Sequence, residues 1–165
     1  MNNLKAFLLT ILLLIMTTGC GLVDRAVQGV VFDQRVGGHL ELAASANTLE
    51  LASQELTIAL ENFKKENPTE GYTSILWRTP DEDVGFWVRN MEAALQELNE
   101  LIAKGNVSNL EASNTLLKLR ETLTNEGEHG TRLFIPDGIS VFPHNKGYFW
   151  TLCLTLGIVP PSLFF

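Results

Sequence analysis

The sequence predicts a mainly α-helical protein, a small antiparallel helical domain flanked by an apolar membrane segment at each end. Apolar residues in the middle of the chain recur with the helical period, and the segments that carry this period begin with residues that cap helices. Both ends of the chain are apolar and nearly free of charge. We therefore divide the chain into residues 1–19 as a lipoprotein-like signal or membrane segment, 20–46 as a tether with a short helix, 47–143 as the helical domain and 147–165 as a C-terminal membrane segment.

The composition excludes several classes of function. The 165 residues include 12 Lys or Arg and 19 Asp or Glu, which gives a net charge of -7. An acidic chain without clustered basic residues does not fit nucleic-acid binding, which requires cations that displace counterions from phosphates. The two cysteines, Cys20 and Cys153, lie in apolar segments at opposite ends, so the middle of the chain has neither a disulfide framework nor a thiolate metal site.

The N-terminal segment resembles a bacterial prolipoprotein signal peptide. Lys5 precedes an apolar run, Ala6–Met16, and small residues lead to Cys20, the candidate site of lipidation. The alternatives are an ordinary cleaved signal peptide and an uncut transmembrane helix, because Ala6–Val23 has no charge and reaches about 27 Å as a helix. Lipidation and the uncut anchor both place the rest of the chain on the extracytoplasmic side of the membrane.

The C-terminal segment predicts a second contact with the membrane. Gly147–Phe165 has no charge and begins with Tyr148, Phe149 and Trp150, residue types that favour a membrane interface. Pro160-Pro161 breaks helical hydrogen bonding, so the helix before it reaches about 18 Å, less than a full span. The segment is a half-span, a dipping segment or part of a longer span, or else an apolar tail that packs on the domain.

The first helix of the domain is expected from Asn47, as the N-cap, to the Asn67-Pro68 pair, with Glu50 completing a capping box. A shorter helix over Leu40–Ser45 precedes it. The apolar stripe expected on the first helix consists of Leu49, Ala52, Leu56, Ala59, Leu60 and Phe63.

Two further helices follow, and the short link between them favours an antiparallel pair. The second is expected to begin at the cap Thr79, with Pro80 at its first position and Glu82 in a capping box, and to end at Gly105. The third is expected between the cap Ser108, with Glu111 in its capping box, and Gly127. The apolar stripe expected on the second helix consists of Val84, Trp87, Met91, Ala94, Leu95, Leu98, Leu101 and Ile102.

Two segments are expected to be extended. Tyr72–Trp77 is rich in residues that favour strands, and Arg132–Phe142 has two apolar runs around Pro136-Asp137-Gly138. Pro fixes φ and Gly accepts a positive φ, so this tripeptide is typical of a turn. A short β-hairpin and irregular extended chain are both consistent with this pattern.

No motif of a catalytic, metal or nucleotide site is present. The acids at 81–83 are favoured at a helix N-terminus by the helix dipole, and they lack the spacing of a calcium loop. His39 and Glu41 have no further ligands at the spacing of a zinc site, and Gly37-Gly38 fits a flexible joint better than a phosphate loop. We therefore expect no metal and no cofactor.

The candidates for partner binding are Trp77, Arg78 and Phe86, since Trp and Arg are frequent at the centres of protein interfaces. Trp87 follows the apolar stripe of its helix and is expected in the core. Phe86 falls beside that stripe and is expected at the surface.

Four segments, VFDQRVGGHL, RTPDEDVGFW, LRETL and PDGISVFP, resemble a group of small bacterial membrane-anchored proteins to which no function is attached. The resemblance covers most of the middle of the chain and implies a membrane segment, a helical domain and a second membrane segment. It implies no activity, cofactor or site residue.

The sequence thus favours a membrane-tethered, non-enzymatic scaffold or interaction module of the bacterial cell envelope, with the lipid membrane and an envelope protein as partners. An envelope hydrolase is the first alternative, and it requires a pocket that gathers His39 with Asp81 or Asp83. A carrier of a small ligand or lipid is the second, and it requires a sizeable apolar cavity.

Overall fold

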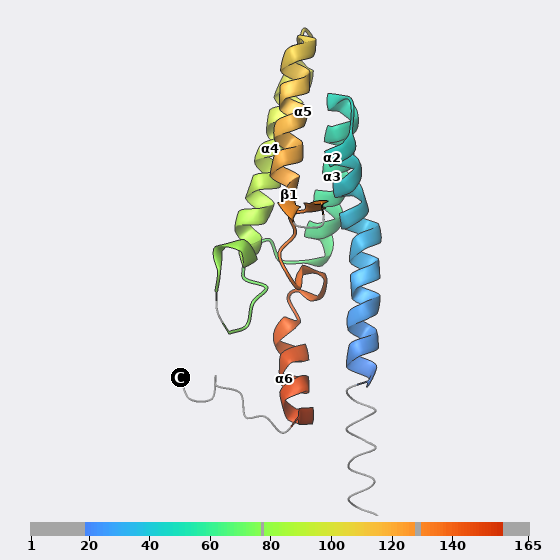
Figure 1. Cartoon of the computed structure of the whole chain (residues 1–165), viewed down its shortest axis with the longest axis vertical. Coiled ribbons are helices and arrows are strands. Elements are labelled where there is room, and N and C mark those ends of the chain that lie inside the picture. Colours follow the sequence, from blue (N-terminus) through green and yellow to red (C-terminus); the bar gives the residue numbers. More distant parts are fainter. Residues whose placement is uncertain (1–18, 77, 128–129, 157–165) are drawn as a thin grey trace, which may run out of the picture.

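Four helices pack around one core as an up-down-up-down bundle (Figure 1). The computed structural model describes residues 19–76, 78–127 and 130–156. Each helix of the bundle packs against the next, and the last also contacts the first, which closes the bundle. The predicted mainly helical fold is confirmed. The four helices are α2 (Gly38–Ser45), α3 (Leu49–Glu66), α4 (Val84–Lys104) and α5 (Asn109–Leu123).

The helix α2 is the last part of a longer continuous helix. Residues 19–32 are α-helical, and a π-helical turn, Asp33–Gly37 (η1), joins them to α2 without a break. At 1.5 Å per residue, residues 19–45 make a rod about 40 Å long. The π-helical turn and α2 pack against α3, whereas residues 19–32 extend beyond the end of the bundle (Figure 1).

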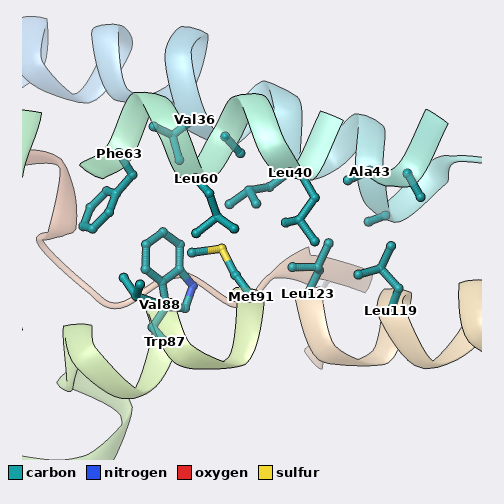
Figure 2. Packing of buried hydrophobic residues seen from close by; sticks show 14 of the residues in the cluster. Val36, Leu40, Ala43, Leu60, Phe63, Trp87, Val88, Met91, Leu119 and Leu123 are labelled. Atoms are coloured by element: carbon teal, nitrogen blue, oxygen red, sulfur yellow. The ribbon is translucent and has the colours of Figure 1, made fainter. Parts of the chain in front are cut away.

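The predicted stripes on α3 and α4 face one another in the core (Figure 2). Every expected stripe residue of α3 is buried, and so are most of those of α4. The rings of Phe63 and Trp87 meet edge to face, with centroids 5.1 Å apart. The Trp87 indole N–H donates to the carbonyl oxygen of Phe134 at 2.9 Å, which fastens the segment after the sheet to the bundle.

Two predicted helix ends are confirmed. Ser108 caps α5, because its hydroxyl oxygen accepts a hydrogen bond from the Glu111 N–H at 3.1 Å. Gly105 ends α4 with φ of 67°, a left-handed conformation that costs glycine little.

Two predicted starts are wrong by a few residues. The N-cap of α3 is Thr48 rather than Asn47, because the Thr48 hydroxyl accepts from the Leu51 N–H at 3.2 Å. The N-cap of α4 is Asp83 rather than Thr79. The stretch Pro80–Glu82 (η2) is a separate 3-10 turn, because Asp83 has an extended backbone that separates it from α4.

The short hairpin exists, but it lies earlier in the chain than predicted. The helix α5 ends at Leu123 rather than Gly127, and β1 (Thr124–Gly127) pairs in antiparallel fashion with β2 (Gly130–Leu133). The predicted turn at Pro136-Asp137-Gly138 forms, with φ of 74° at Gly138, but it leads into the 3-10 turn Ile139–Val141 (η3) instead of a returning strand.

The segment expected to be extended at Tyr72–Trp77 forms no regular strand in its described residues. Its contact with the bundle is a single bridge between Tyr72 and Asp83, flanked by hydrogen bonds from the Thr73 N–H to the Glu82 oxygen and from the Val84 N–H to the Gly71 oxygen. These bonds join residues 71–73 to residues 82–84 at the start of α4.

The last helix, α6 (Asn145–Leu156), lies outside the bundle. It leaves the same end as residues 19–32 and runs beside them (Figure 1). Residues 147–156 of the predicted second membrane segment belong to α6. Residues 157–165 of that segment lie outside the described part of the chain.

Candidate functional site

Exposed aliphatic side chains gather on the helix at residues 19–32. Leu22, Val23, Val27 and Val30 are each at least half exposed, with values from 51% to 66%. Cys20, the predicted lipidation site, is exposed on the same helix. Residues 1–18, which contain most of the predicted signal segment, lie outside the described residues.

A polar contact joins α6 to this helix. The Tyr148 hydroxyl donates a hydrogen bond to the Asp24 carboxylate. This bond, together with partial burial and the negative charge of Asp24, raises the pKa of Tyr148 above its ordinary value of 10.0, and Arg25 opposes the shift. The two helices are therefore held together at a point beyond the bundle.

The helix α6 also presents apolar groups. Trp150, Leu152 and Leu154 are 37%, 46% and 74% exposed, whereas Cys153 is buried. Within residues 19–76, 78–127 and 130–156, no helix has both the length and the apolar character needed to cross a membrane.

Two of the predicted partner-binding residues are described: Arg78 lies in the loop before α4, and Phe86 lies on the first turn of α4. Phe86 is 48% exposed, as expected, and the neighbouring Trp87 is buried in the core, also as expected. The Arg78 guanidinium lies 5.3 Å from the centre of the exposed Tyr72 ring, a cation–π geometry. Trp77 lies outside the described residues.

The acids weighed as catalytic groups have structural partners. The Asp83 carboxylate accepts a hydrogen bond from the Phe86 N–H at 3.0 Å, and the Thr79 hydroxyl donates to Glu82 at 2.5 Å. His39 pairs with Glu55 of α3, at 2.6 Å, and not with Glu41 as we considered from the sequence. The described residues contain no group of three side chains placed to hold a metal ion.

A cavity of about 500 Å³ lies where the loop before α4, the turn at 137–141, α6 and the 19–32 helix meet. Its apolar lining includes Ile75, Val141 and Phe149. Its polar lining includes three groups whose buried side-chain atoms have no hydrogen-bond partner among the described residues, namely Thr73 Oγ1, Ser74 Oγ and Asn145 Oδ1.

We did not predict this cavity from the sequence. Thr73-Ser74 stands within a stretch that favours a strand, and Asn145 lies about 70 positions further along the chain. Such polar residues are common at surfaces, so the pattern carries no signal that they share one wall. The structural sign of this wall is the burial of Thr73, a polar residue that is only 3% exposed.

Comparison with known proteins gives no match to a family model, to a curated protein or to a solved structure. The resemblance to small bacterial membrane-anchored proteins therefore stays a prediction.

Proposed function

We propose that this protein is a membrane-tethered, non-enzymatic scaffold or interaction module of the bacterial cell envelope, with its helical bundle on the extracytoplasmic side. The observation that supports this function most directly is the common direction of two helices. Residues 19–32 and α6 leave the bundle at one end and lie side by side (Figure 1). Both carry exposed apolar side chains.

This arrangement suits attachment to one membrane. In the sequence, the uncharged segments at 6–23 and 147–165 overlap these two helices, although they belong to opposite ends of the chain. Helices that leave a bundle in the same direction can enter one bilayer without reorganising the bundle. Transfer of exposed aliphatic groups from water to lipid stabilises this orientation by about 25 cal/mol for each Å² of apolar surface that is removed from water.

Protein binding, in this proposal, involves Trp77, Arg78 and Phe86 near the start of α4. The exposure of Phe86 and the position of Arg78 over an aromatic ring support this choice. Asp83 and His39 are engaged in a helix cap and in a pair with Glu55, which favours a scaffold over a carboxylate hydrolase.

The intact mass of the membrane-extracted protein, wild type and Cys20→Ala, tests the tether. Loss of residues 1–19 with a gain of acyl mass in the wild type alone indicates a lipoprotein. Full-length mass in both, with retention in the membrane after alkaline extraction, indicates an uncut anchor. Recovery of both proteins in the soluble fraction would contradict the proposed tether.

A further inference from the structure

We propose that the cavity between the loop before α4 and α6 binds a single-chain amphiphile, with one acyl chain and a head that donates hydrogen bonds and carries no negative charge. This inference goes beyond the proposed tether and does not depend on it, because it rests on the lining of the cavity alone.

Three buried polar atoms close to the cavity have no hydrogen-bond partner among the described residues. A buried polar group without a hydrogen bond costs about 1–3 kcal/mol, so most such groups in proteins are paired. Thr73, Ser74 and Asn145, which carry buried oxygens without a hydrogen-bond partner among the described residues, all line this one cavity. In our proposal these three residues form a small polar wall whose oxygens a ligand head satisfies.

The type of these atoms defines the head of the ligand. The Asn145 amide nitrogen already donates to the Gly138 oxygen at 2.9 Å, which leaves its carbonyl oxygen, an acceptor, for the ligand. The described residues that line the cavity include two acids, Glu82 and Asp137, and one cation, Arg25. A hydroxyl-bearing head therefore fits this wall, whereas an anionic head meets repulsion.

The apolar part of the lining defines the rest of the ligand. Ile75, Leu76 and Val141 face the cavity from the loops, and Phe149 and Leu152 face it from α6. A volume of about 500 Å³ is in the range of pockets for small molecules and accommodates a single acyl chain with a small head.

Thr73 and Ser74 belong to the loop before α4, and Asn145 is the first residue of α6. Residues 74–76 belong to neither a helix nor a regular strand. The loop is fixed at its base by the hydrogen bond from the Thr73 N–H to the Glu82 oxygen, at 3.1 Å. Because the Thr73 and Ser74 oxygens are buried in the free protein, ligand binding in this proposal includes a rotation of these two side chains toward the cavity.

The test uses the full chain, kept in solution by an amphipathic polymer without detergent, and titration calorimetry with monolaurin, laurate and glycerol. Monolaurin has the proposed chain and head, laurate has the same chain on an anionic head, and glycerol is the head alone. We expect saturable binding of monolaurin, weaker binding of laurate and no measurable binding of glycerol.

The variant Thr73→Val separates recognition from stability. It replaces an unpartnered hydroxyl by a methyl group of the same shape, so the melting temperature of the free protein should stay the same or rise. The affinity for monolaurin should fall about fivefold or more, as expected for one lost hydrogen bond. The matched control is Thr57→Val on α3, whose hydroxyl donates to the Ser53 oxygen at 2.7 Å, and it should bind monolaurin like the wild type.

Ser74→Ala removes a second unpartnered hydroxyl and decides the test if Thr73→Val does not fold. Wild-type affinity for monolaurin in the variants that fold would overturn the proposal, since the polar wall would then have no role in binding. Equal affinity for laurate and monolaurin, or no saturable binding of monolaurin, would also overturn it.

Discussion

The adjacent residues Phe86 and Trp87 have opposite environments on one helix. Successive residues of an α-helix are rotated by about 100°, so a stripe that points Trp87 into the core turns Phe86 toward solvent. Phe86 is 48% exposed and Trp87 is 3% exposed. The indole of Trp87 does two things that a smaller ring does not, since it fills the space beside Phe63 and donates to the Phe134 oxygen.

We predict that Trp87→Phe lowers the free energy of unfolding by about 1–3 kcal/mol, because it removes this hydrogen bond and leaves a small cavity. Phe86→Leu is the matched control and should change that free energy by less than about 0.5 kcal/mol, as is usual at exposed positions. Urea unfolding followed by far-UV circular dichroism measures both. Equal effects of the two substitutions would contradict the assignment of Trp87 to the core.

At the scale of elements, the existence of the helices was predictable and their ends were less so. The stripe from Leu49 to Phe63 follows the helical period over the whole helix, because the apolar residues of this stripe all face the core. A cap depends on one residue, and both Asn47 and Thr48 are able to provide it. The structure uses Thr48, whose backbone is extended. The hairpin was misplaced because Gly127, a plausible helix stop, lies at the end of a strand.

The pairing of α6 with residues 19–32 gives a prediction on pH. Phenolate beside the Asp24 carboxylate is disfavoured, so the pKa of Tyr148 is raised and the neutral hydroxyl persists above pH 10. The contribution of this contact to stability is present below pH 10 and is lost as the pH rises through the raised pKa. Spectrophotometric titration of the phenols should show a midpoint that Tyr148→Phe removes.

Asp24→Ala should shift that midpoint toward the ordinary value of 10.0. Asp33→Ala, which removes an exposed carboxylate from the π-helical turn of the same rod, should leave it in place. An unchanged midpoint in Asp24→Ala would mean that α6 does not lie against this helix in solution.

At the scale of the whole molecule, the sites depend on segments that the sequence keeps apart. The cavity joins Arg25, Thr73 and Asn145, and no local pattern brings such residues together. Phe86 was predictable as an exposed residue because its position is set by the periodicity of one helix. The common direction of the two apolar helices depends on the number of helices in the bundle and on their connections. The number of helices and the order in which they connect can be derived from the sequence only after every helix has been identified.

Two of the exposed apolar side chains of the bundle, Phe86 and Leu117, allow a partner surface to be distinguished from a surface that is merely accessible to solvent. Phe86 lies at the start of α4, beside the loop that carries Arg78, and Leu117 lies on α5 with a similar exposure of 54%. If exposure alone governed contacts, a photo-crosslinking phenylalanine analogue would react similarly at both positions. A partner surface at Phe86 instead predicts one adduct of defined mass from that position in intact cells, and none of that mass from Leu117.

Arg78→Ala, combined with the crosslinker at position 86, should reduce the yield of this adduct several-fold. Arg is enriched among the few interface residues whose truncation costs about 2 kcal/mol or more of binding free energy. Lys104→Ala is a suitable control, since Lys104 is an exposed cation at the opposite end of α4. The same adducts from positions 86 and 117, or an equal loss of yield in the two charge variants, would place protein binding elsewhere on the molecule.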